Sequence, residues 1–187
     1  MKFHREILIA STLLGSWLGM QAVHELGHAC GAWLTGGSVQ KVVLHPLTIS
    51  RTDLAENPSP LLVVWAGPLV GVLLPVPFWL VAAAVRMPGS FVLRFLAGFC
   101  LVANGLYIGL GSFGRIGDCG EMLRNGSPLW HLWLFGLITI PIGVWLWHGQ
   151  GGEFGLGKSP KMVSPPIAYT TLGIVLTTVA VELIAGV

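Results

Sequence analysis

Residues 7–34, ILIASTLLGSWLGMQAVHELGHACGAWL, decide the fold, because this apolar run is long enough to cross a bilayer as one helix. Its one charged side chain, Glu25, stands inside the motif HELGH at residues 24–28. His24 and His28 are four positions apart and project from the same face of a helix, so both can bind one Zn²⁺. The glutamate between them can then address the water that such a metal activates. Ionisable groups are costly in hydrocarbon, so we predict a metal site here; the alternative is a cluster of packed histidines without metal.

The composition is that of an integral membrane protein. Of the 187 residues, 53% are hydrophobic and 10% are charged, whereas about a quarter of the residues of a soluble domain carry charge. The mean hydropathy is +0.77. A net charge of +2 without a basic run predicts no nucleic-acid partner. Cys30, Cys100 and Cys119 lack CxxC spacing, so we expect neither a disulfide framework nor a cysteine-only zinc cluster.

Hydropathy predicts an all-α polytopic membrane protein with about five transmembrane helices. The expected spans are residues 7–34, 61–85, 91–113, 129–147 and 167–187. Pro75 and Pro77 should kink the second span, and the glycine-rich stretch 105–120 should resist regular helix and line a cavity. The N-terminal run resembles a secretory signal, but it continues past any cleavage site near Ala22, so we expect a retained helix. The expected location is the cell membrane, with several passes.

The loop at residues 36–60 is expected to contain a short β-strand or hairpin. Residues 38–45 are rich in β-branched side chains, and residues 47–50 follow Pro46. Two interpretations stay open. The segment is an interfacial loop, or it offers a strand edge that binds a substrate in extended form beside the metal.

Three segments converge at one depth. With a rise of about 1.5 Å per residue, His24 and His28 lie about 9 to 15 Å inside the end of the first span. Gly67 lies about 9 Å inside the start of the second span, and Asn104 about 13 Å inside the end of the third. These two spans run in the same direction, so Asp118 can return from beyond the third span as a third metal ligand. Asn104 is predicted to donate to a developing oxyanion, or alternatively to bridge two helices. The rivals of Asp118 as a ligand are Glu121, Cys119, His131 and His45.

The motifs resemble those of the site-2 protease family of intramembrane zinc metalloproteases, peptidase family M50. The resemblance rests on HELGH at residues 24–28, on Ala-Gly-Pro at residues 66–68 and on Asp118. The approach to this aspartate is glycine-rich, where the family usually has proline. The resemblance covers a three-helix catalytic core, residues 1–125, whereas residues 126–187 form two additional transmembrane helices.

The resemblance also implies roles for individual residues. The zinc ligands would be His24, His28 and Asp118. Glu25 would be the general base, and Asn104 would correspond to an asparagine close to the catalytic centre.

The predicted function is hydrolysis of peptide bonds in membrane-spanning or membrane-associated proteins by a zinc metalloendopeptidase. The expected partners are that substrate protein and the lipid bilayer, and the sequence leaves the oligomeric state open. The alternative is a zinc-binding membrane protein without hydrolysis: a transporter, an assembly factor or an inactive protease relative. A transporter should carry polar groups across the whole bilayer, whereas the half of the spans away from the site offers Arg94 and Glu182. Lysines and arginines divide almost evenly between the two sides, so the orientation stays open.

Overall fold

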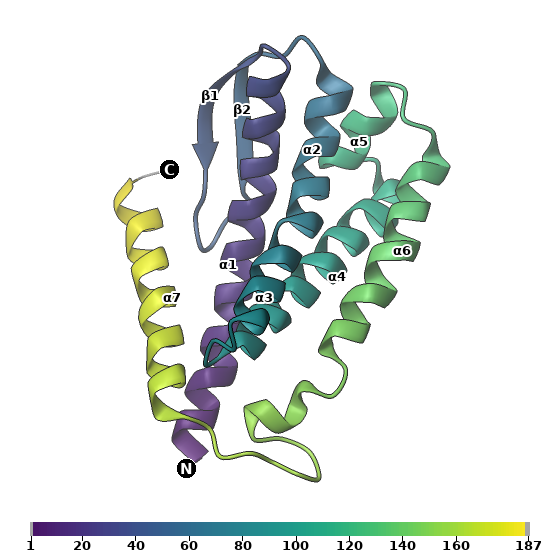
Figure 1. Ribbon diagram of the computed structural model, residues 1–187. Helices are drawn as coiled ribbons and strands as arrows, with labels where there is room; N and C mark the ends of the chain where they lie inside the picture. Colours follow the sequence, from purple (N-terminus) through teal and green to yellow (C-terminus); the bar gives the residue numbers. More distant parts are fainter. Residues whose placement is uncertain (1, 186–187) are drawn as a thin grey trace.

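Five long apolar helical segments run side by side in the computed structural model, which describes residues 2–185 (Figure 1). The elements, in chain order, are α1 (Lys2–Leu34), β1 (Ser38–Val43), β2 (Arg51–Glu56), α2 (Pro60–Leu73), α3 (Pro75–Ala84), α4 (Ser90–Gly114), α5 (Gly117–Arg124), α6 (Leu129–Trp147), the 3-10 turn η1 (Gln150–Phe154) and α7 (Pro165–Ala185). Helices α2 and α3 together make one span, and α1, α4, α6 and α7 are the others. The predicted all-α architecture with five spans is confirmed.

The second span bends between α2 and α3. Pro75 begins α3 and Pro77 follows it, and proline has no backbone N–H to continue the hydrogen-bond ladder of the preceding turn. The N–H of Leu74 still bonds to the carbonyl of Val70 at 2.9 Å, so the chain kinks there and continues as a helix. The predicted kink is confirmed.

The glycine-rich stretch 105–120 is mostly helical, so the prediction of irregular backbone there was wrong. Helix α4 continues to Gly114, and α5 begins at Gly117. The glycines serve helix packing instead: a methyl group added at Gly109 would lie 3.3 Å from the Cα of Gly136 on α6. Small residues allow two helix backbones to approach closely in a membrane, where dispersion contacts hold helices together.

The loop after α1 forms an antiparallel hairpin in which Val43 of β1 is opposite Arg51 of β2. The predicted hairpin is confirmed, but its second strand lies at residues 51–56 and not at 47–50. Residues 47–50 belong to the connection instead, because Pro46 has no N–H to offer a strand ladder.

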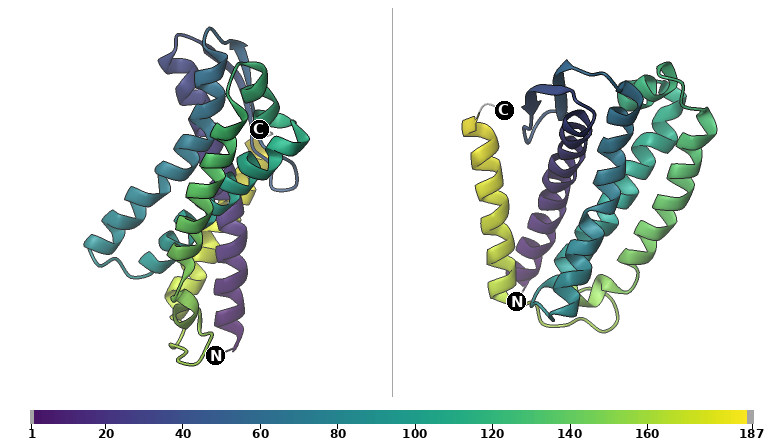
Figure 2. Two further views of the ribbon diagram at one scale, coloured as in Figure 1. Left: turned by 90° about the vertical axis from the view of Figure 1, so that its right-hand side faces the viewer. Right: turned by 45° about the horizontal axis from the view of Figure 1, so that its top comes forward.

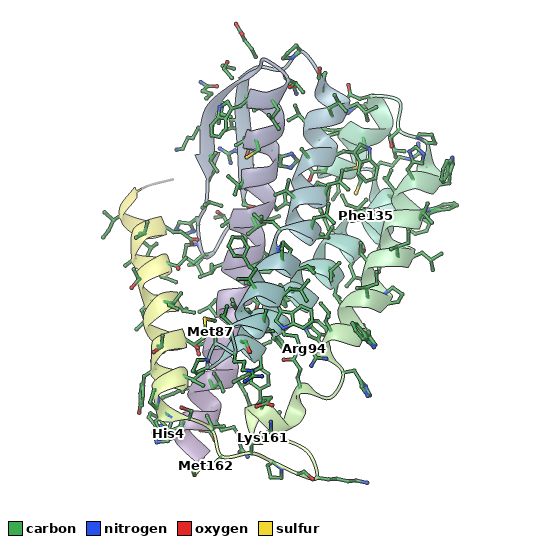
Figure 3. All side chains as sticks on the ribbon, viewed as in Figure 1. His4, Met87, Arg94, Phe135, Lys161 and Met162 are labelled. Atoms are coloured by element: carbon green, nitrogen blue, oxygen red, sulfur yellow. The ribbon has the colours of Figure 1, made fainter. Side chains whose placement is uncertain are left out.

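The two ends of the helix bundle carry different elements and side chains. The hairpin and α5 lie at the end where α1 finishes (Figure 2), whereas Arg94 and Lys161 lie towards the end where α1 begins (Figure 3). Glu182 is near the end of α7, which runs in the same direction as α1 (Figure 1). The prediction that placed Glu182 in the half away from the metal motif was therefore wrong.

The outer faces of the helices are apolar. Leu137, Ile174 and Leu80 are 72%, 63% and 51% exposed, while Ile108 and Leu132 are fully buried between helices. In a spanning helix most backbone polar groups bond within their own segment, and side chains such as these suit contact with lipid. The structure is that of a multi-pass integral membrane protein.

Candidate metal centre

Close packing of α1 on α2 positions the two histidines. A methyl group added at Gly27 would collide with the carbonyl of Ala66, and one added at Gly67 would collide with the imidazole of His28. The glycines therefore let the α1 backbone approach α2 until the Nδ1 of His28 lies 2.9 Å from the carbonyl oxygen of Val63. The Ala-Gly-Pro motif of α2 thus shapes the wall against which His28 packs.

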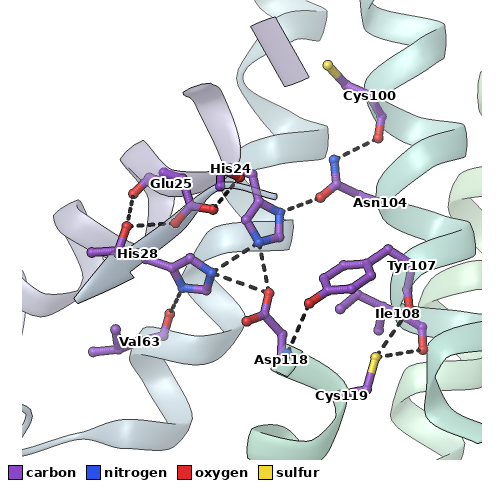
Figure 4. A network of polar contacts seen from close by, with 12 residues as sticks. His24, Glu25, His28, Val63, Cys100, Asn104, Tyr107, Ile108, Asp118 and Cys119 are labelled. Carbon is purple, nitrogen blue, oxygen red and sulfur yellow. Dashed lines mark hydrogen bonds and ion pairs between the residues drawn. The ribbon is translucent and has the colours of Figure 1, made fainter. Parts of the chain in front are cut away.

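The imidazoles of His24 and His28 meet a carboxylate oxygen of Asp118 at one point (Figure 4). The Nε2 atoms of His24 and His28 are 3.0 Å apart. Oδ2 of Asp118 lies 2.8 Å from Nε2 of His24 and 3.3 Å from Nε2 of His28. In tetrahedral zinc sites, metal–ligand bonds of about 2.1 Å place ligand atoms about 3.4 Å apart. The three atoms are therefore nearly at the spacing of a zinc ligand set.

The other nitrogen of each imidazole is held by an oxygen acceptor. Nδ1 of His24 lies 2.7 Å from Oδ1 of Asn104, and Nδ1 of His28 faces the Val63 carbonyl. A carbonyl can only accept, so each Nδ1 donates its proton. This fixes the tautomer that leaves Nε2 free to bind a metal, and metal-binding histidines usually have such a partner behind them.

The turn between α4 and α5 brings Asp118 to this point. Arg115 and Gly117 both have positive φ angles, 53° and 56°. A side chain at residue 117 would collide with the hydroxyl of Tyr107, and that hydroxyl accepts a hydrogen bond from the backbone N–H of Asp118 at 3.1 Å. Glycine therefore allows the first turn of α5 to press against α4, with Asp118 directed at the histidines.

The imidazoles of His24 and His28 and the carboxylate of Asp118 together favour a bound cation. With both Nδ1 atoms protonated, two imidazole lone pairs and a carboxylate oxygen face one another. Burial disfavours the charged form of Asp118, but hydrogen bonding and charge from His24 and His28 outweigh burial and lower the pKa of the carboxyl. A positive charge between the three atoms, either protons on the imidazoles or a metal ion, relieves their mutual repulsion. The donor set of two imidazoles and a carboxylate fits Zn²⁺.

Two of the rivals of Asp118 as the third ligand make other contacts. The thiol of Cys119 donates to the carbonyl of Tyr107 at 3.2 Å, and burial raises the pKa of Cys119 to about 11. Glu121 forms an ion pair with Arg124 on the surface of α5. Within residues 2–185, His24, His28 and Asp118 are the one group of potential ligands that converges on a point.

Glu25 lies beside this group and its carboxylate is buried, with 3% of the residue exposed. Each carboxylate oxygen accepts a hydroxyl hydrogen bond from the hairpin: Oε1 from Ser50 and Oε2 from Thr52, both at 2.7 Å. The motif thus places His24 and His28 on one face of α1 and the Glu25 carboxylate next to them, as the helical spacing predicts.

The family model described as Peptidase M50B-like matches residues 9–109, more than half of the chain. The chain belongs to this family. The matched residues include the HELGH motif and Asn104 and end before Asp118. Members of the M50 family are integral membrane proteins and zinc metalloproteases, and the family also includes inactive relatives. No curated protein and no solved structure matches the chain.

Asn104 of this M50B-like protein contacts two other residues through its side-chain amide. Its Oδ1 accepts the hydrogen bond from His24, and its Nδ2 donates to the carbonyl of Cys100 at 2.9 Å. It also fills the space next to Gly71, where an added methyl group would lie 3.0 Å from its side chain. The interhelical contact considered from the sequence is therefore present. Donation by Asn104 to an oxyanion stays a prediction; one Nδ2 hydrogen donates to Cys100, and the second hydrogen would make that contact.

A cavity of about 980 Å³ opens beside the candidate centre. It is bounded by α1, α2, α4, α5 and the hairpin, and it contains His24, Glu25 and Asp118 in its wall. Every residue from Ile49 to Leu54 lines it as well. Side chains alternate along a strand, so lining by consecutive residues means that the edge of β2 faces the cavity.

Four contributors to the centre were not predicted from the sequence, namely Ser50, Thr52, Val63 and Tyr107. Val63 acts through its backbone carbonyl, which no side-chain pattern can reveal. Tyr107 lies three positions after Asn104 on the same face of α4, and this spacing was an available signal. The hydroxyl residues Ser50 and Thr52, two positions apart in the polar loop, were a weaker signal.

Proposed function

We propose that this chain is an intramembrane zinc metalloprotease that hydrolyses peptide bonds of membrane-spanning or membrane-associated proteins. The observation that carries the proposal is a buried glutamate beside three converging metal-ligand atoms, all facing one cavity. Membership of the M50B-like family supports it. The proposed site residues are His24, His28 and Asp118 as zinc ligands and Glu25 as the general base.

Each residue has a defined task in this proposal. Two imidazoles and one carboxylate would hold Zn²⁺, which when bound lowers the pKa of a water molecule towards about 7 and polarises the scissile carbonyl. Glu25 takes a proton from the attacking water and passes it to the leaving nitrogen. Asn104 and the Val63 carbonyl keep the two imidazoles in the tautomer and orientation that zinc binding needs.

The cavity suits an extended polypeptide. The edge of β2 faces the cavity, and an exposed strand edge can pair with a substrate through main-chain hydrogen bonds. A substrate paired there would lie in the cavity along β2, close to Glu25. A peptide bond in a transmembrane helix is closed to attack because its carbonyl is hydrogen-bonded, so the substrate must unwind locally to pair in this way.

The test is cleavage of a single-span reporter protein by the purified chain, with wild type beside Glu25→Gln. Glutamine keeps the size of the side chain but cannot accept the water proton, so we expect activity to fall by at least about 10²- to 10⁴-fold. Zinc content, measured on the same preparations by atomic absorption, should stay near one ion per chain.

Two results would contradict the proposal. Cleavage retained by Glu25→Gln would remove this residue from the role of base. A wild-type protein that binds zinc but cleaves no reporter would instead support the alternative of a zinc-binding M50 relative without hydrolysis.

A further inference from the structure

The hairpin is attached to the candidate base through the hydroxyls of two residues. The hydroxyls of Ser50 and Thr52 donate to Oε1 and Oε2 of Glu25, each at 2.7 Å, and Oγ1 of Thr52 also lies 3.3 Å from the backbone carbonyl of Glu25. These residues are 25 and 27 positions away along the chain. The contact is therefore made by the fold and not by local sequence.

The strand geometry explains how two hydroxyls reach one carboxylate. Ser50 directly precedes β2 and Thr52 is its second residue; side chains two positions apart in extended backbone point the same way, and both project towards α1. Arg51 and Asp53 project to the other face, where they form an exposed ion pair at 3.2 Å. Pairing of Thr52 with Val42 of β1 fixes this register. A slip of one residue would replace the two hydroxyls by a charged pair.

We propose that Ser50 and Thr52 are positioning residues that hold the Glu25 carboxylate in its working orientation; this inference rests on the proposed proteolytic function. A free glutamate side chain on a helix rotates about three single bonds. Each hydroxyl has one proton to donate and directs it to one carboxylate oxygen, so the plane of the carboxylate is held. Each oxygen retains a lone pair that can accept a proton from water.

The attachment also couples the base to the substrate side of the cavity. Thr52 lies on β2, whose edge faces the cavity, and its side chain holds Glu25 at the same time. A shift of β2 therefore moves the carboxylate relative to the histidines. Misplacement of a reacting group by about 1 Å can cost about 10²-fold in rate.

The test compares pairs of variants that keep or remove the hydroxyl. Thr52→Val has the shape of threonine without its donor, and Thr52→Ser keeps the donor; Ser50→Ala and Ser50→Thr form the second pair. Thr48→Val is the matched control, because Thr48 is exposed in the same connection. Kinetics of reporter cleavage and zinc content are measured on the full-length protein in detergent for every variant and for Glu25→Gln.

We expect Thr52→Val and Ser50→Ala to lower kcat by about 10- to 100-fold, with KM nearly unchanged. Thr52→Ser, Ser50→Thr and Thr48→Val should stay within about threefold of wild type, and zinc content should stay constant throughout. A rise of KM at constant kcat in Thr52→Val would assign the residue to substrate docking and overturn the inference. An equal loss in Thr52→Ser and Thr52→Val would do so too, because the hydroxyl would then be irrelevant.

A stability measurement checks the contact without relying on catalysis. In a double-mutant cycle, Thr52→Val should lower the thermal midpoint of wild type by more than it lowers that of Glu25→Ala, because the second protein has no carboxylate to hold. Equal shifts would overturn the inference. Failure of the proposed function has a different signature: wild type cleaves nothing, or Glu25→Gln cleaves as well as wild type.

Discussion

At the scale of single residues, the two histidines show how an apolar helix carries a metal-binding pair. His24 and His28 are 7% and 8% exposed, so neither imidazole can rely on water for its Nδ1 proton. Asn104 and the Val63 carbonyl supply the acceptors. An unsatisfied buried donor costs about 1–3 kcal/mol, so these partners stabilise the fold and the tautomer together.

The identity of the third ligand gives a residue-scale prediction. Asp118→Ala should lower zinc content well below one ion per chain, because a His₂ pair alone lacks the carboxylate that completes the set. Cys119→Ser should retain zinc, since the Cys119 thiol faces the Tyr107 carbonyl. Zinc titration of both purified variants checks this. Loss of zinc in Cys119→Ser with retention in Asp118→Ala would reverse the assignment.

A second residue-scale prediction concerns Asn104. Asn104→Ala leaves the Nδ1 of His24 without its acceptor, so zinc affinity should fall by about 10- to 100-fold. Asn104→Asp keeps an acceptor oxygen at the same place and should bind zinc far better than Asn104→Ala. Competition with a zinc-chelating dye measures both constants. Equal affinities for the two variants would show that His24 does not depend on this hydrogen bond.

At the scale of elements, the packing of α1 on α2 is what sets the distance between the histidines and the wall of the site. Gly27 and Gly31 of α1 lie against Ala66 and Gly67 of α2, where added methyl groups would collide. Between membrane helices such small residues permit dispersion contacts along the backbone. The same contact brings the Val63 carbonyl within reach of His28.

Gly67→Ala tests this packing. The new methyl group would overlap the His28 imidazole, so the variant should lose about 1–3 kcal/mol of stability through overpacking and bind zinc more weakly. Gly173→Ala on α7 is the control, because an added methyl group there has nothing within 4 Å. Alanine favours a helix more than glycine does, so the thermal midpoint of Gly173→Ala should equal or exceed that of wild type. Zinc titration and thermal melts in detergent measure both effects, and an unchanged zinc affinity in Gly67→Ala would contradict the packing argument.

At the scale of the whole molecule, the centre ties together three segments that are distant in sequence. His24 lies on α1, Asp118 on α5, and Asn104 on α4. Helix α6 packs on α4 from the other side, through glycines such as Gly136. Residues 126–185 therefore pack directly on the predicted three-helix core. The division of the chain into two parts at residue 125 stays a prediction.

Removal of the metal should destabilise the whole molecule. A ligand that binds only the folded state at 100 times its Kd stabilises that state by about 2.7 kcal/mol. Chelation should thus lower the thermal midpoint of wild type, and added zinc should restore it. The double variant His24→Ala/His28→Ala should show no response to either treatment. The same response in wild type and the double variant would place zinc at another site.

The sequence by itself determined the features that depend on neighbouring residues. Hydropathy is a local property, so the five spans could be located, and a helix of 3.6 residues per turn places His24 and His28 on one face whatever surrounds it. The kink at Pro75 follows from the missing N–H. Glu25 could be singled out because a charge in an apolar helix is costly.

Only the tertiary structure decided the contacts between distant segments. The direction of a side chain across a helix interface depends on packing, so sequence could propose Asp118 beside its rivals but could not separate it from Cys119, which turns away from the centre. The hydroxyls of Ser50 and Thr52 reach Glu25 because the register of the hairpin brings them there. That register is set by pairing between strands and by packing on α1, and both form only when the chain folds.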